Sequence, residues 1–212
     1  MTTTELLALF RSEVIDLELP YLWSDALVYG YIDAAQKQFC RDSFGIADSR
    51  SFGVTIVPGT QWYTLDAKIL KLRDAIDAAT GLDMPLIAAE KMHEHNMKFD
   101  GKQGPIQALI TGLDENMLRA WPIPSLAADI ELRTFRLPVT VEAGDDLEVP
   151  EQHQRYLLYW VKYLAYSVHD TEAYDKGAAD RYFAKHQAYC LKAKIEQSRA
   201  RRPVSTVTYG GC

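Results

Sequence analysis

The chain has 212 residues, of which 48% are hydrophobic and 25% charged, with 12 Gly, 9 Pro and 3 Cys. This composition excludes a disordered tail, which is poorer in apolar residues, a collagen-like chain, which is far richer in Gly, and a disulfide scaffold, which needs more Cys. The net charge of -6 is unevenly distributed, because residues 1–149 carry a net charge of -10 and residues 150–202 one of +4. An acidic body with a basic end favours association between subunits. The alternative explanation is that both charged faces are simply exposed to solvent.

The first fifty residues predict two helices. Thr2 and Glu5 form a capping-box pattern, and Pro20 ends the first helical run. Ser24 is a favourable N-cap for a second, longer helix, which Gly45 ends. The apolar positions at helical spacing in the first helix are Leu7, Phe10, Val14 and Leu17. Those of the second are Leu27, Tyr31, Ala34 or Ala35, Gln38 and Phe39.

The block from 51 to 147 changes to short β segments. Strands are expected near residues 51–57, 61–65, 68–78, 107–113, 117–121 and 131–139. Asp114, Glu115 and Asn116 fit a hairpin turn, and residues 86–96 look like a short helix. We therefore expect a small antiparallel sheet with one short helix.

Helical patterns return after Pro150. Residues 151–171 are apolar on nearly the whole circumference of a helix, with Lys162 as the main exception. Such a helix is covered on nearly all sides, either by a partner helix and a second subunit or, in a monomer, by the three other helices. Nine of the 23 aromatic residues lie between 151 and 193, on the two C-terminal helices.

Asp175 is a candidate cap for the last helix, whose C-terminal end is basic. The cations there are Lys192, Lys194, Arg199, Arg201 and Arg202. One or two of them complement the helix dipole, and the remainder could bind an acidic surface or nucleic acid. Pro203 ends the helix, and residues 203–212 form an uncharged tail with β preference.

Motifs for catalysis are not found. The sequence contains no GxGxxG, Walker A, GxSxG or CxxC pattern. Glu90 and His93 have the spacing of two metal ligands on a helix, but a di-iron bundle needs two such motifs and further carboxylates. We expect no metal and no cofactor, and a solvated helix face at Glu90 and His93.

No signal peptide or membrane span is expected, because charged residues interrupt every apolar run. Cys40, Cys190 and Cys212 are odd in number and irregularly spaced, which favours reduced thiols in a soluble intracellular protein.

Two segments carry a resemblance to a known family. Trp23-Ser24-Asp25 opens a helix that contains Asp33 to Gln36, and Trp121-Pro122-Ile123-Pro124 precedes ELRTFRLP, an acidic connector and an aromatic helical hairpin. In these features the chain resembles the adaptor (head–tail connector) proteins of tailed bacteriophages, including the group related to the tail tubular A proteins.

The resemblance implies an α+β fold in which both chain ends, residues 1–50 and 148–202, form a helical bundle. Residues 51–147 would be an inserted β domain and residues 203–212 an extended tail. It also implies a structural virion protein without enzymatic activity: a ring, commonly dodecameric, that joins the portal protein to the tail or nozzle in the neck of the virion. The ring would form in the host cytoplasm during assembly and continue the channel for packaged DNA, which it contacts only non-specifically, with no membrane contact.

On this reading two sets of residues have roles. The aromatic residues expected to pack the bundle and the subunit interface are Tyr156, Tyr159, Trp160, Tyr163, Tyr166, Tyr182 and Phe183. Those expected to bind the portal are Lys192, Lys194, Arg199, Arg201, Arg202, Val204, Thr206, Val207 and Tyr209, with the tail adding a β-strand.

Three alternatives stay open. A tail-completion or tail-terminator protein is a neighbouring structural role. A metal-dependent enzyme that uses Glu90 and His93 belongs to another class, and stoichiometric bound iron or zinc would indicate it. A helical regulator that dimerises through residues 151–171 predicts a fixed dimer.

Overall fold

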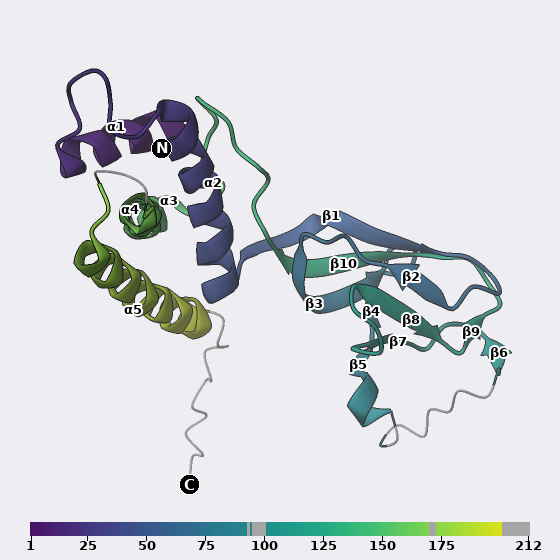
Figure 1. Cartoon of the computed structure of the whole chain (residues 1–212). Helices are drawn as coiled ribbons and strands as arrows, with labels where there is room; N and C mark the ends of the chain where they lie inside the picture. The colour runs from purple at the N-terminus through teal and green to yellow at the C-terminus, as the bar shows by residue number, and fades with distance from the viewer. Residues whose placement is uncertain (93, 95–100, 170–172, 201–212) are drawn as a thin grey trace, which may run out of the picture. The chain divides into compact units, whose positions relative to one another are not determined.

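The computed structural model describes residues 1–92, 94, 101–169 and 173–200. The chain divides into two compact units, one of residues 1–44 and 138–212 and one of residues 45–137. The first contains the α-helices and the second the strands (Figure 1). The protein is therefore mixed α+β, as predicted. We call the two parts the helical unit and the β unit.

The helical unit begins with α1 (Thr3–Val14) and α2 (Asp25–Asp42). The capping box of Thr2 and Glu5 is confirmed, and the Ser24 hydroxyl accepts a hydrogen bond from the Leu27 amide at 3.4 Å. Two details of the prediction are wrong. Helix α1 ends at Val14, so Leu17 lies outside it and is 65% exposed. In α2 the predicted Ala35 and Phe39 are buried, but the other buried residues differ from those predicted: Val28, Ile32, Gln36 and Cys40.

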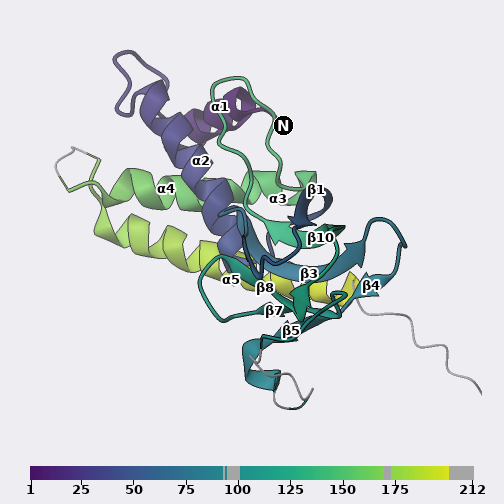
Figure 2. The same ribbon diagram turned by 90° about the vertical axis from the view of Figure 1, so that its right-hand side faces the viewer.

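The C-terminal part of this unit forms a helical hairpin. It consists of α3 (Glu151–Gln154), the 3-10 turn η2 (Arg155–Leu157), α4 (Leu158–Ser167) and α5 (Lys176–Ala200). The helix predicted for residues 151–171 is thus shorter and contains a 3-10 turn. Helices α4 and α5 lie side by side (Figure 2), and α4 also contacts α1 and α2.

The core of the helical unit contains residues from α1, α2, η2 and α4. Its fully buried side chains include Leu6, Phe10, Val28, Ile32, Leu157 and Val161. Trp23, from the segment between α1 and α2, donates its indole N–H to the Ala165 carbonyl at 3.2 Å. Its ring makes edge contacts with Phe10 and Tyr166. Burial of these side chains stabilises the packing of the chain's first helices on α4.

The described residues of the β unit form three sheets. The first orders β1 (Ile46–Ile56), β10 (Ala128–Arg136), β3 (Ile69–Asp77) and β4 (Asp83–Met84), all antiparallel. The second orders β2 (Trp62–Thr64), β8 (Met117–Trp121), β7 (Ala108–Thr111) and β5 (Leu86–Ala88). The third pairs β6 (Gln103–Gly104) with β9 (Ile123–Pro124).

The predicted single antiparallel sheet is wrong in two respects. The strands form separate sheets, and β5–β7 and β6–β9 are parallel pairs. The hairpin of β7 and β8 around Asn116 is confirmed. The two larger sheets share one apolar core, to which β1, β3 and β10 contribute from one side and β7 and β8 from the other: Ile56, Ala75, Leu109, Leu118, Ala120, Ile130 and Leu132.

Asp48 ties together an irregular part of the β1–β10 ladder. Its carboxylate accepts hydrogen bonds from the backbone amides of Arg50 and Ser51, both at 3.0 Å, and from Arg136 Nε at 2.7 Å. The register of β1 against β10 shifts between Asp48 and Phe52. The Arg50 amide, with Arg136 and Ser51, holds the pKa of Asp48 well below its usual value, although burial acts in the opposite direction. The charged form of Asp48 therefore stabilises this bulge.

Asp48→Asn is expected to destabilise the β unit by about 2 kcal/mol at pH 7, because it removes charge-assisted hydrogen bonds. A carboxyl group with a lowered pKa stabilises fully above its unfolded pKa of about 3.9 and loses that contribution as pH falls through its folded pKa. The difference between wild type and variant should therefore shrink below about pH 4. Urea unfolding at pH 7 and pH 3 measures it, and an equal difference at both values would contradict the role of the charge.

Candidate functional site

The aromatic residues predicted to form a subunit interface contact one another within the helical unit. The Trp160 ring lies 4.8 Å from that of Tyr163 and 6.1 Å from that of Phe183, between centroids. Tyr166 stacks on Tyr182 at 6.0 Å. All five side chains are half-buried. They thus pack the α4–α5 hairpin and keep part of their surface exposed.

Tyr156 and Tyr159 continue this set toward the start of α4. Tyr156 stacks on Tyr189 of α5 at 3.8 Å between ring centroids, and its ring lies 5.9 Å from that of Tyr159. Tyr156 is 36% exposed. The predicted aromatic residues therefore lie along both helices of the hairpin in three groups of contacting rings.

Lys162, expected as the polar exception on this helix, is buried. Its side chain is 5% exposed, and its ammonium group donates to Glu13 Oε2 of α1 at 2.5 Å. Burial raises the pKa of Glu13, but the hydrogen bond and charge of Lys162 outweigh this and leave that pKa lowered. The one charged side chain of α4 is thus buried within the chain, where its ammonium group is paired with the Glu13 carboxylate.

Three of the predicted portal-binding residues lie on the exposed C-terminal end of α5. Lys192 is 3.8 Å from Glu196, Lys194 lies over the Phe44 ring, and Arg199 is exposed. The other six, Arg201, Arg202, Val204, Thr206, Val207 and Tyr209, lie outside the described residues.

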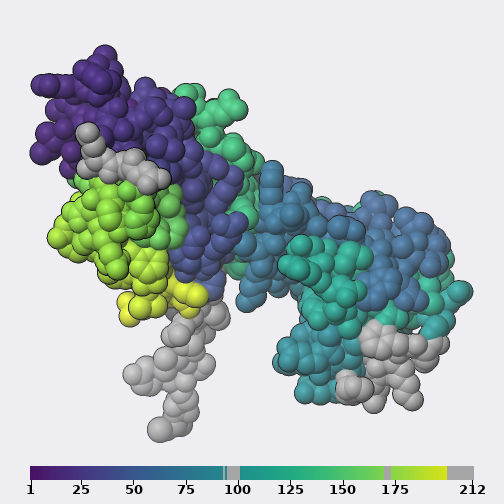
Figure 3. Space-filling view, viewed as in Figure 1, coloured from purple at the N-terminus to yellow at the C-terminus, as the bar shows by residue number. Residues whose placement is uncertain are grey.

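The segment between α1 and α2 exposes a row of large apolar side chains that the sequence analysis did not single out. We call residues 15–22 the N-terminal apolar loop. Ile15 is 84% exposed, Leu17 65%, Leu19 78% and Leu22 46%. In Figure 3 the purple N-terminal segment forms part of the outer surface of the helical unit. Contiguous exposed apolar side chains of this kind are typical of protein–protein contact sites.

Arg11, on α1, holds this loop in place. One guanidinium nitrogen donates to Asp16 at 2.6 Å, and the other donates to the Trp23 carbonyl at 2.9 Å and to Asp25. The Tyr21 ring lies 3.5 Å from the guanidinium carbon. Arg11 is only 7% exposed. The loop is therefore fixed by buried polar contacts while its leucines face solvent.

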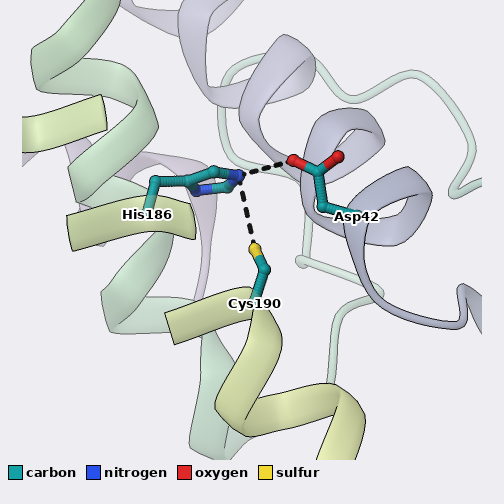
Figure 4. Close-up of side chains that lie close together, drawn as sticks. All are labelled: Asp42, His186 and Cys190. Atoms are coloured by element: carbon teal, nitrogen blue, oxygen red, sulfur yellow. Dashed lines mark hydrogen bonds and ion pairs between the residues drawn. The ribbon is translucent and has the colours of Figure 1, made fainter. Parts of the chain in front are cut away.

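A second cluster brings α2 and α5 together. Asp42 Oδ2 lies 3.1 Å from His186 Nε2, and Cys190 Sγ lies 3.3 Å from the same nitrogen (Figure 4). His186 and Cys190 are buried, and Asp42 is half-buried. A cavity of about 310 Å³ adjoins Asp42 and Cys190 and is also lined by Trp160, Phe183 and Lys194.

This geometry does not fit a nucleophilic triad. In such a triad the carboxylate and the nucleophile bind opposite ring nitrogens of the histidine, whereas here both approach Nε2. Burial, with the charges of Asp42 and Cys40, raises the pKa of Cys190 to about 12. Burial also lowers the pKa of His186, against the effect of Asp42. A protonated thiol is a poor nucleophile, so the cluster is unsuited to covalent catalysis without a further group.

The alternative pair of Glu90 and His93 is not supported as a helical motif. Residues 86–88 form strand β5 and Glu90 lies in the 3-10 turn η1 (Ala89–Lys91), so the short α-helix predicted there is wrong. Glu90 is exposed, and His93 lies outside the described residues.

The sequence pattern of the SU10 adaptor protein family matches residues 1–207. The match covers both units. The chain belongs to this family. A comparison with curated proteins found no match. Membership in the SU10 adaptor family confirms the predicted resemblance to phage adaptor proteins, whereas the relationship to the tail tubular A group stays a prediction.

The SU10 adaptor family assignment suggests a structural component of a phage virion that interacts with other virion components and is not an enzyme. Within the described part of the chain, no helix has the length and apolar character that crossing a membrane requires.

Sequence reasoning missed two groups of residues. For the N-terminal apolar loop, a signal was present: four large apolar residues stand between Val14 and Trp23, around Pro20. For the cluster, His186 and Cys190 at i and i+4 lie on one helix face, but Asp42 is 144 residues away in the sequence.

Proposed function

We propose that this protein is a structural virion protein whose copies form an adaptor ring between the capsid portal and the tail or nozzle. The observation that carries this proposal is the match to the SU10 adaptor protein family over residues 1–207. The helical unit from both chain ends serves as the assembling part, and the β unit, inserted between them in sequence, faces the tail. The ring continues the channel through which DNA passes, and it contacts DNA only non-specifically.

The exposed surface of the helical unit supports a ring. A closed ring needs two different complementary surfaces on each subunit, because each copy contacts its neighbours head to tail. One is the N-terminal apolar loop, which presents Leu17 and Leu19 on a rigid support. The other is the face of α5 where Leu191 is 60% and Ile195 44% exposed.

In this arrangement the loop of one subunit packs on α5 of the next. The receiving surface is the wall of the 310 Å³ cavity formed by Trp160, Phe183 and Leu191. Trp160 and Phe183 are half-buried, so a neighbour's leucine would complete their burial. The tyrosines Tyr156, Tyr159, Tyr163, Tyr166 and Tyr182 then extend this interface, since aromatic side chains contribute strongly to association energy.

Portal binding is assigned to the C-terminal end of α5 and the residues beyond it. Lys192, Lys194 and Arg199 are exposed and can face acidic groups of the portal. Residues 204–209 have a sequence with β preference. Such a segment is suited to adding a strand to a sheet of the portal, where alternate side chains would face the portal surface. We place the assembled ring in the neck of the virion and its assembly in the host cytoplasm.

Binding to the cognate portal tests this function. The full-length protein is expected to form one ring per portal, probed by electron microscopy and by mass measurement of the complex. Deletion of residues 203–212 should abolish portal binding without changing the thermal unfolding of the chain. If the full-length chain does not bind the portal, the adaptor function is wrong. If the full-length chain and the deletion variant both bind the portal at normal occupancy, the role of the tail is wrong.

A further inference from the structure

The three donors of the Asp42–His186–Cys190 cluster converge on one point between α2 and α5. A carboxylate oxygen, an imidazole nitrogen and a sulfur lie within 4.8 Å of one another. We propose that Asp42, His186 and Cys190 form a zinc site with three protein ligands and one open position. The site links the end of α2 to α5 and goes beyond the proposed adaptor function.

The spacing of the donors suits zinc. Zinc bonds of about 2.0–2.3 Å to oxygen, nitrogen and sulfur in a tetrahedron separate neighbouring donor atoms by about 3.3–3.6 Å. His186 Nε2 is 3.1 Å from Asp42 Oδ2 and 3.3 Å from Cys190 Sγ. Small side-chain rotations would therefore bring the donors to coordination distances. Mixed nitrogen, sulfur and oxygen donors favour zinc over magnesium or calcium, which prefer oxygen alone.

A single imidazole nitrogen faces two polar partners in this arrangement. His186 Nε2 carries either one proton or one lone pair, so it cannot both donate to Asp42 and accept from the Cys190 thiol. A metal ion on the same side of the ring interacts favourably with all three groups. On binding, the thiol releases its proton to solvent and the thiolate forms a sulfur–metal bond, while the neutral imidazole binds through Nε2.

The fourth coordination position can be filled from the adjoining cavity. Asp42 and Cys190 both line this space of about 310 Å³, which is large enough for a water ligand. Three protein ligands with an open position differ from a closed structural site of four ligands. A bound metal would hold α5 against α2 next to Trp160, Phe183 and Lys194 of the same cavity.

Cobalt(II) substitution tests the site on the purified, reduced full-length chain without portal. We expect one Co²⁺ per chain, with the strong visible absorption of tetrahedral cobalt and a near-ultraviolet thiolate-to-cobalt charge-transfer band. Zn²⁺ should displace the Co²⁺ and raise the thermal unfolding temperature. The proposal is overturned if the wild-type protein binds no Co²⁺, or binds it without the thiolate band. No substituted protein is needed for this test.

Variants then assign the ligands. Cys190→Ser should remove the charge-transfer band, and His186→Asn and Asp42→Asn should each weaken Co²⁺ binding at least tenfold. His153→Asn is the matched control, because His153 is another buried histidine of the same unit whose Nδ1 contacts the Tyr189 hydroxyl at 2.9 Å. It should leave binding unchanged. A thiolate band that survives in folded Cys190→Ser, checked by circular dichroism, contradicts the assignment.

Discussion

The double substitution Leu17→Asp/Leu19→Asp is expected to abolish ring formation on the portal while leaving the helical unit folded. Both side chains are largely exposed in the single chain, at 65% and 78%, so folding gains little from them. In the proposed ring they become buried against α5 of the next subunit. Full burial of two leucines contributes about 3–6 kcal/mol, so each contact should weaken at least a hundredfold.

The β unit offers a matched control. Leu82 and Leu126 are 68% and 66% exposed, and the double substitution Leu82→Asp/Leu126→Asp adds the same charge. It should leave the number of copies per portal unchanged. A loop variant that still forms complete rings, counted by electron microscopy, would show that the N-terminal apolar loop is not a subunit contact.

A substitution on the receiving face tests whether the contact is head to tail. Leu191→Asp should block ring formation in the same way as the loop variant. Each variant keeps one intact surface, so an equal mixture of the two can form a single productive contact but no closed ring. Sedimentation of this mixture should detect heterodimers that neither variant forms alone.

Local signals in the sequence predicted the helix starts correctly. The capping box at Thr2 and the cap at Ser24 depend on residues within three positions, so no distant partner alters them. The buried face of α2 was harder to predict. Apolar residues recur at helical spacing in two sets that differ by one position, so the sequence pattern fits either face. The side that packs against the other helices of the unit buries Val28, Ile32 and Ala35.

The end of α1 depends on distant residues and was predicted wrongly. Leu17 continues the helical period of Leu7, Phe10 and Val14, yet the chain turns at Ile15, which has a φ of 60°. The competing interaction is the set of bonds from Arg11 to residues 16, 23 and 25. Periodicity contains no information about a buried arginine that binds a loop carbonyl.

The strand pairing and the cluster of Asp42, His186 and Cys190 could not be predicted from the sequence, for the same reason. β2 was predicted to follow β1 in one sheet, but it pairs with β8, more than fifty residues later. Asp42 reaches His186 only because α2 and α5 pack together. Such contacts depend on the arrangement of whole elements, whereas the strands and helices themselves follow from local patterns.

Arg11→Leu is expected to cause a large loss of stability in the helical unit. It removes the partner of Asp16, whose side chain is only 8% exposed, and leaves the Trp23 carbonyl without this donor. Breaking a buried ion pair from one side costs about 3–5 kcal/mol. The unfolding temperature should fall by about 10 °C, a shift typical of such a loss in a domain of this size. Thermal unfolding followed by circular dichroism measures it.

Two further variants separate charge from geometry. Arg11→Lys keeps the charge but cannot contact Asp16, Asp25 and the Trp23 carbonyl together, so it should recover only part of the stability. Arg155→Ala is the exposed control: its side chain is 71% exposed and lies 3.5 Å from Glu13, so the loss should stay below about 1 kcal/mol. If Arg11→Lys matches wild type in both stability and ring formation, the charge alone suffices. The several hydrogen bonds of the guanidinium would then not be needed to hold the loop, and the rigid support that the ring proposal assigns to them would be wrong.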